Sequence, residues 1–154
     1  MVTVNLLHRF PYFAGVNEWI LEDIAALSEE RVARTGEVLF RDGEPASHLY
    51  FVIEGEVDLR YPSGPGQYTT VDTAVAGDLM AWSAVVEPHV IRAMAVVRKN
   101  ARLVAIKGPE LCELMNEDPV LGRGLSSHVA AAAGERLKGV RLQIAARAPL
   151  SVTA

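Results

Sequence analysis

Residues 36–59 read GEVLFRDGEPASHLYFVIEGEVDL, and this stretch sets the fold class. Runs of β-branched and aromatic residues occupy Val38–Phe40, His48–Ile53 and Glu56–Tyr61. The segments between these runs contain glycine, which readily supplies the positive φ angles that tight turns require. The pattern therefore predicts three short strands joined by turns.

Similar runs continue beyond this stretch. Further strands are predicted at Tyr68–Thr73, Val90–Val97 and Arg102–Ile106. The turn sequence PSGPG precedes the first of these strands, and AGD lies between the first and the second. Many short strands at this spacing, over residues 31–106, favour a β-sandwich or a β-barrel.

Helices are predicted on both sides of the β-rich region. Val4–Phe10 and Asn17–Ser28 carry apolar residues at helical spacing, and Asn17 is a candidate N-cap. Later in the chain, Pro109 suits the first turn of a helix, and Asp118 is the expected cap of a longer helix that starts at Pro119.

The longer helix carries an apolar stripe with steps of three or four residues. Its members are Leu121, Leu125, Val129, Ala133, Leu137, Val140 and Ile144. Such a stripe packs either within its own subunit or against the same helix of a second subunit. We expect a homodimer through this helix, and we expect Pro149 to close the helical run.

The stretch quoted first resembles the cyclic nucleotide-binding domain, a family that includes the catabolite activator protein, regulatory subunits of cyclic-nucleotide-dependent kinases and gated ion channels. The residues that fall on or near the family pattern are Gly36, Leu39, Phe40, Gly43, Glu44, Ala46, Leu49, Tyr50, Val52, Gly55 and Val57. The resemblance extends from Leu6 to about Arg147 and is closest to the sensor domains of the catabolite activator and Fnr-like regulators.

The resemblance implies a mainly β fold, an eight-stranded jelly-roll barrel with flanking helices. One domain would span residues 1–147, with N-terminal helices in 1–30, the β-roll in 31–107 and C-terminal helices in 108–147, followed by a tail at 148–154. Transcription factors of the family place a DNA-binding module after the long helix. Only APLSVTA follows Arg147 here, so we expect a standalone domain that does not bind nucleic acid by itself.

The resemblance also implies a ligand site in GDLMAWSAVVEPHVIRAMAV, residues 77–96. In ligand-binding members, backbone N–H groups of a short helix, expected here at Leu79–Ala84, face a phosphate, and an arginine adds a charge-assisted hydrogen bond. Arg92 falls on that arginine. Ala81 replaces the family glycine, and Trp82 replaces the glutamate that accepts from the ribose.

These substitutions change what the site can bind. Trp82 cannot accept the ribose hydrogen bond because indole is only a donor, and its ring could fill the sugar pocket. MAWSAVV is similar to a tryptophan-serine-alanine run found in many standalone bacterial members. The candidate ligand-binding residues are Met80, Ala81, Trp82, Ser83, Arg92 and Arg136.

Two arginines have open alternatives. Arg92 either binds an anion, or lies in solvent or pairs with a carboxylate such as Asp78 or Glu87. Arg136 lies where the long helix of ligand-responsive relatives contacts the base. It either stacks on a ring or binds an anion, or it lies in water.

Composition excludes several other classes. The net charge of −4 argues against a broad nucleic-acid-binding surface, and the single cysteine, Cys112, excludes an intrachain disulfide or a cysteine-rich metal site. Cys112 is expected to be a buried apolar residue. Four scattered histidines without an H-x-H pair predict no metal centre, and no motif predicts an enzyme. The start MVTVNLLHRF lacks a signal peptide and no run spans a membrane, which predicts a cytoplasmic protein.

The sequence thus supports two functional hypotheses. The first is a sensor or regulatory domain that binds a small anionic ligand and signals through a dimer or an unknown protein partner. The sequence identifies no definite cofactor, and a cyclic nucleotide is retained as a candidate ligand. The second is a ligand-free jelly-roll scaffold that has lost nucleotide binding. A closed barrel mouth and an Arg92–carboxylate pair would favour the scaffold.

Overall fold

A computed structural model describes residues 1–147 of the chain. The helical elements are α1 (Val4–Leu7), η1 (Pro11–Phe13), α2 (Glu18–Ala26), η2 (Trp82–Ala84), α3 (Gly108–Glu117) and α4 (Pro119–Arg147). The strands are β1 (Ser28–Ala33), β2 (Val38–Phe40), β3 (His48–Gly64), β4 (Gln67–Ala74), β5 (Leu79–Met80) and β6 (Met94–Lys107). The expected tail at 148–154, with Pro149, lies outside the described residues.

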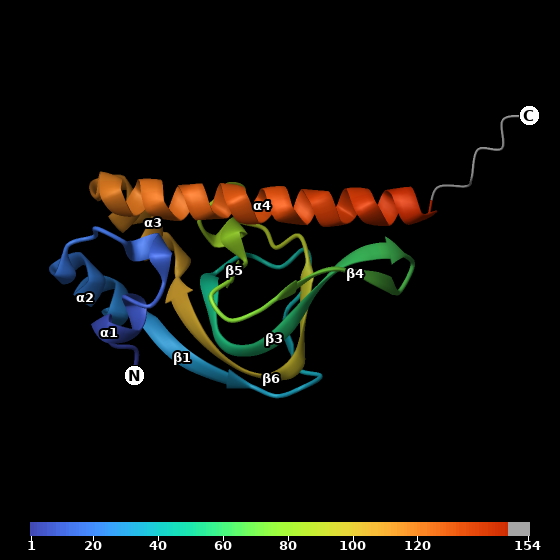
Figure 1. The fold of residues 1–154 in the computed structure, drawn as a ribbon, viewed down its shortest axis with the longest axis horizontal. Helices are drawn as coiled ribbons and strands as arrows, with labels where there is room; N and C mark the ends of the chain where they lie inside the picture. Colours follow the sequence, from blue (N-terminus) through green and yellow to red (C-terminus); the bar gives the residue numbers. More distant parts are fainter. Residues whose placement is uncertain (148–154) are drawn as a thin grey trace, which may run out of the picture.

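The described strands form one antiparallel sheet around two long central strands. Its main order is β1-β6-β3-β4, while β2 also pairs with β6 and β5 also pairs with β3. Figure 1 shows β3 and β6 curving together, with α4 lying along one side of the roll and the N-terminal helices at one end. This arrangement is the mainly β fold that the resemblance implied.

The expected number of eight strands is not confirmed, because six strands are found within residues 1–147. The runs His48–Ile53 and Glu56–Tyr61 join in β3. Gly55, at a φ of 95°, lies among shifts in the β3–β6 register and does not end the strand. An irregularity of this kind bends a strand while pairing continues on both sides.

Other boundaries also differ from the expectation. Residues 94–107 form the single strand β6, and Val90 makes only an isolated bridge to Pro45. The expected helix at Leu79–Ala84 is divided into β5 and η2. The helix predicted to reach Ser28 ends at Ala26, because Ser28 already pairs with Ile106 in the sheet.

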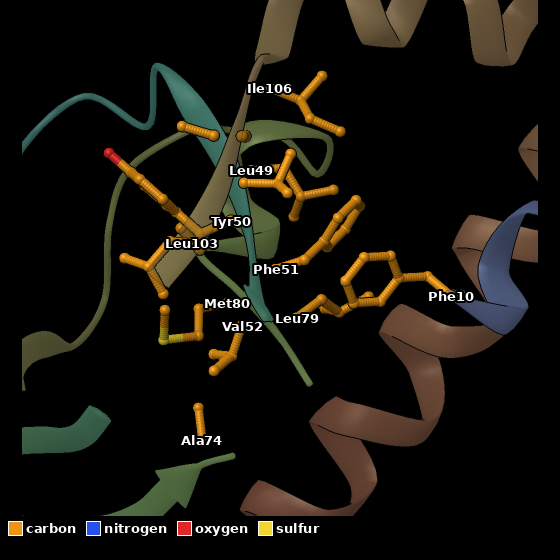
Figure 2. Packing of buried hydrophobic residues seen from close by; sticks show 14 of the residues in the cluster. Phe10, Leu49, Tyr50, Phe51, Val52, Ala74, Leu79, Met80, Leu103 and Ile106 are labelled. Atoms are coloured by element: carbon orange, nitrogen blue, oxygen red, sulfur yellow. The ribbon is translucent and has the colours of Figure 1, made fainter. Parts of the chain in front are cut away.

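The core lies between the concave side of the roll and the helices. Figure 2 shows Phe51 of β3 facing Phe10, with ring centroids 5.2 Å apart, and Leu79 and Met80 of β5 nearby. Phe51, Met80 and Leu103 are fully buried. The short strand β5 therefore contributes to the core even though it has only two residues.

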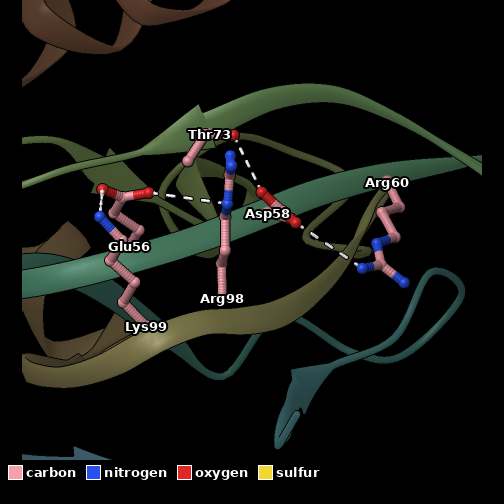
Figure 3. Close-up of polar contacts among 6 residues, drawn as sticks. All are labelled: Glu56, Asp58, Arg60, Thr73, Arg98 and Lys99. Atoms are coloured by element: carbon pink, nitrogen blue, oxygen red, sulfur yellow. Dashed lines mark hydrogen bonds and ion pairs between the residues drawn. The ribbon is translucent and has the colours of Figure 1, made fainter. Parts of the chain in front are cut away.

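The middle of β3 alternates between the two faces of the sheet. Val57 and Leu59 are buried, whereas Glu56, Asp58 and Arg60 lie on the opposite side and are partly exposed. Figure 3 shows ion pairs on that side, from Glu56 to Lys99 at 3.0 Å and from Asp58 to Arg60 at 3.6 Å. Because side chains alternate along a strand, Leu59 and Tyr61 point to the other face of the sheet, the face that α4 covers.

The C-terminal helices begin as the sequence predicts. Pro109 lies in the first turn of α3, and Asp118 Oδ1 accepts hydrogen bonds from the backbone N–H groups of Val120 and Leu121 at 3.0 and 3.3 Å. Asn17 is the N-cap residue of α2, but its side chain makes no capping hydrogen bond. Among the described residues, no helix is both long and apolar enough to cross a bilayer.

Candidate functional site

A cavity of about 250 Å³ lies between β3, the η2 turn, residues 91–93 and α4. Its apolar wall consists of Phe40, Leu59, Ile91 and Ala93. Its polar groups come from Tyr61, Arg92, Arg136 and the turn at Ala81–Ser83. We refer to it as the anion cavity because two arginines line it.

The turn that precedes η2 retains a glycine-like conformation without glycine. Ala81 has φ 58° and ψ 41°, which is the left-handed region that non-glycine residues rarely occupy. The backbone N–H groups of Trp82 and Ser83 then lie in the first turn of η2, where the helix itself supplies no acceptor. Ala81, which replaces the glycine of the family pattern, therefore has a backbone conformation that favours glycine.

His89, which lies in the loop between η2 and Arg92, makes a hydrogen bond to the η2 turn. His89 Nδ1 lies 2.8 Å from the backbone oxygen of Ser83, and this nitrogen must be the donor because a carbonyl only accepts. His89 N–H also donates to the backbone oxygen of Val86 at 3.0 Å. These hydrogen bonds hold the loop that connects η2 to Arg92 against the η2 turn.

Arg92 follows this loop and reaches the anion cavity from the sheet side. Its side chain is exposed, and within residues 1–147 it has no hydrogen bond or ion pair. The expected alternative of a pair with Asp78 or Glu87 is therefore not found. Its guanidinium remains able to donate to a ligand.

Arg136 enters the cavity from α4 and stacks on Trp82. Its Cζ atom lies 3.9 Å from the centroid of the indole ring, and the residue is only 8% exposed. The alternative that placed Arg136 in water is wrong. The arginine covers the tryptophan face, where the ring quadrupole attracts a cation.

The buried guanidinium of Arg136 is incompletely satisfied. Its Nε has no hydrogen-bond partner among the described residues. Burial lowers the pKa of Arg136, while Tyr61 and Asp72 act in the opposite direction. Arginine stays protonated in proteins, so Arg136 places a positive charge at the cavity wall.

Five of the six predicted site residues thus line one cavity: Ala81, Trp82, Ser83, Arg92 and Arg136. Met80 does not line it, because this residue is fully buried in β5 opposite Tyr50. Cys112 is half-buried, and its Sγ lies 3.6 Å from the backbone oxygen of Ala84. No cluster of metal-ligating side chains is found in the described part of the chain.

Sequence reasoning missed the walls of the cavity. Leu59 and Tyr61 line it together, and their spacing of two residues on a predicted strand was the available signal. Phe40, Ile91 and Ala93 also line it, but nothing in their local sequence distinguishes them from ordinary core residues.

Comparisons with known proteins identify the family of this chain. The family model of the cyclic nucleotide-binding domain matches residues 30–118. This chain therefore belongs to the cyclic nucleotide-binding domain family, whose members are regulatory and binding domains. The match includes η2, Arg92 and α3, while α4 with Arg136 lies beyond it.

Three relatives illustrate the range of similar proteins. A solved structure described as a cyclic nucleotide-binding protein from Geobacter metallireducens is 34% identical, with a TM-score of 0.77 over 89% of this chain and 99% of that chain. The catabolite activator protein of Thermus thermophilus is 23% identical, with a TM-score of 0.68 over 87% of this chain and 61% of that chain, and supports the fold alone. A protein from Rhodopseudomonas palustris described as a potassium channel is 26% identical over 99% of this chain. This chain spans 36% of the length of that curated relative.

Proposed function

We propose that this chain is a cyclic nucleotide-binding-like sensor or regulatory domain that takes a small anionic ligand in the anion cavity. The observation that supports this most is the pair Arg92 and Arg136, two guanidinium groups that line one cavity. Charge-assisted hydrogen bonds from arginine are among the stronger polar interactions in proteins. The anion would connect the loop after η2 to α4.

The signal would pass from this connection to a surface of α4. Ala130, Leu137 and Ile144 are exposed and spaced by seven residues, which places them on one face of the helix. Leu137 and Ile144 are 57% and 64% exposed. We propose that this face contacts the same helix in a homodimer, and that ligand binding shifts the helix through Arg136.

The ligand-free scaffold remains the second candidate, and one observation favours it. Trp82 replaces the glutamate to which the resemblance assigns ribose binding, and its ring is stacked against Arg136, so the site lacks that acceptor. A scaffold of this kind would bind no anion at the site, although it could still form the dimer.

Calorimetry with cAMP, cGMP, a cyclic dinucleotide and inorganic phosphate separates the two candidates. We expect at least one of these anions to bind, and Arg92→Ala to weaken its binding by about 10- to 100-fold. The matched control is Arg34→Ala, which removes an exposed arginine that does not line the cavity. Failure of all four anions, or equal loss in both variants, would leave the scaffold.

A further inference from the structure

The walls of the anion cavity are mainly apolar. Phe40, Leu59, Ile91 and Ala93 line it, and all four are buried. The ring of Phe40 is held by a stacked contact with Tyr50, with ring centroids 5.7 Å apart. A polar group of a ligand placed against these side chains would lose its hydrogen bonds to water without replacing them. The part of a ligand that contacts this wall is therefore favoured to be apolar.

The charged side chains of the cavity are both cations. Arg92 and Arg136 line it, and among the described residues the lining contains no carboxylate and no carboxamide. The only side-chain oxygens in this lining are the hydroxyl groups of Tyr61 and Ser83. The side chains thus attract a negative charge and offer few hydrogen-bond acceptors.

The backbone acceptors along the cavity are already used. The carbonyl oxygens of Ala81–Ser83 accept, in order, from the N–H groups of residues 84–86 at 3.0, 2.9 and 3.3 Å. On the apolar wall, the Ile91 carbonyl oxygen accepts from Gly43 N–H at 2.8 Å, and Ile91 N–H donates to the Glu44 oxygen at 2.8 Å. A ligand hydroxyl, which must donate its hydrogen, would find these acceptors already bonded.

Trp82 adds no acceptor to the cavity. Its indole can only donate, and one face of the ring is stacked against the Arg136 guanidinium. The glutamate of the family pattern would accept from a sugar hydroxyl at this position. With tryptophan in its place, a buried sugar hydroxyl lacks that partner, which weakens binding by about tenfold.

We infer that the anion cavity selects a hydrophobic anion, a phosphate or carboxylate on an apolar aryl or alkyl body, and disfavours sugar phosphates. This inference rests on the proposed function, because it names the ligand class of the same site. Arg92 and Arg136 bind the anionic group, and the apolar body lies against Phe40, Leu59 and Ile91. The cavity volume of about 250 Å³ suits a body of one ring better than a large ligand.

Calorimetry with phenyl phosphate and ribose 5-phosphate tests the selectivity, because both probes are phosphate monoesters and only their bodies differ. We expect phenyl phosphate to bind about tenfold more tightly than ribose 5-phosphate. Inorganic phosphate, which has no body, should also bind more weakly than phenyl phosphate. Equal binding of the two monoesters, or tighter binding of ribose 5-phosphate, overturns the inference.

Trp82→Gln tests the source of the selectivity. Glutamine supplies an acceptor without adding charge, so the preference for phenyl phosphate should fall by about threefold or more. Trp19→Gln is the matched control, since Trp19 is 67% exposed on α2 and does not line the cavity. If Trp82→Gln fails to fold, Ile91→Thr takes its place, because it puts a hydroxyl into the apolar wall. An equal change of preference in the cavity variant and the control overturns the inference.

Arg92→Ala places the probes and separates this inference from the proposed function. It should weaken both monoesters by about tenfold or more and leave their ratio unchanged. Phenyl phosphate that binds Arg92→Ala as tightly as the unchanged protein lies outside the anion cavity, and the inference is wrong. If phosphate or a cyclic nucleotide binds but the preference is absent, the anion function stands and only the selectivity fails. If no anion binds, both fail.

Discussion

Gly55 of β3 lies close to the backbone of Asn100 and Ala101 in β6. An added Cβ atom would collide with the backbone oxygen of Asn100 and would lie 2.6 Å from Ala101 Cα. Its φ of 95° is also outside the range that side chains tolerate well. The glycine therefore allows β3 to continue past the irregularity at this position.

Gly55→Ala should lower the free energy of unfolding by about 3 kcal/mol or more, since the contact adds overpacking to backbone strain. Gly43→Ala is the matched control, because Gly43 has a φ of 91° but nothing within 4 Å of its added Cβ. The free energy of unfolding of that control should fall by only about 1–2 kcal/mol. Urea denaturation measures both, and equal losses would mean that the close approach is absent.

Tyr12 gives the protein a predicted weakness at alkaline pH. Its pKa in the folded state is raised above the unfolded value of about 10, chiefly by burial. The stability it contributes is complete below that unfolded value and is lost as the pH rises toward the folded one. Between about pH 10 and 11, the free energy of unfolding should fall by about 1 kcal/mol more than in Tyr12→Phe, because the unfolded chain loses the tyrosine proton first. Urea denaturation across this range measures the difference, and parallel curves would contradict it.

At the scale of elements, the start of α4 depends on a cap that the sequence identifies. Asp118→Ala should lower the free energy of unfolding by about 1 kcal/mol, because two backbone N–H groups lose their acceptor. Asn17→Ala on α2 is the matched control, since Asn17 occupies the N-cap without a side-chain bond. Its loss should be under about 0.5 kcal/mol by thermal or urea denaturation. A larger loss at Asn17 than at Asp118 would show that the caps are misassigned.

The elements that the sequence predicts well are those with strong local signals. Pro109 and Asp118 mark the starts of α3 and α4, and Val38–Phe40 forms β2 with the predicted bounds. β1 was not predicted, because SEERVA has little apolar content and its pairing with β6 decides its conformation. β5 has only two residues, which is too short for any periodicity to appear.

The same distinction applies to the site. The turn at Ala81–Ser83 and Arg92 could be placed through the family pattern, since they lie in one continuous segment. Burial of Arg136 could not, because the residue stands between the exposed Glu135 and Leu137 on α4. Its environment is created by Trp82, which reaches it only when α4 lies against the roll. A contact between two segments this far apart in the chain has no signal in the local sequence of either segment.

At the scale of the whole molecule, α4 connects the anion cavity to an exposed surface. Arg136 lines the anion cavity and is buried, whereas Leu137, the next residue, is 57% exposed. A ligand that prefers one position of Arg136 could therefore shift α4, provided that its affinity differs between the two positions. The buried residues Leu121, Leu125 and Val129 hold the first half of the helix, so the second half is the part that can respond.

This arrangement predicts a homodimer that separates when the exposed face of α4 is charged. The double variant Leu137→Glu with Ile144→Glu should be monomeric in sedimentation velocity at micromolar concentration, because opposed carboxylates would repel across the helix pair. Trp19→Glu is the control, since Trp19 is 67% exposed on α2, away from this face. The control should remain dimeric. A monomeric unchanged protein, or dissociation of the Trp19 variant alone, would remove α4 as the interface and with it the proposed route of signalling.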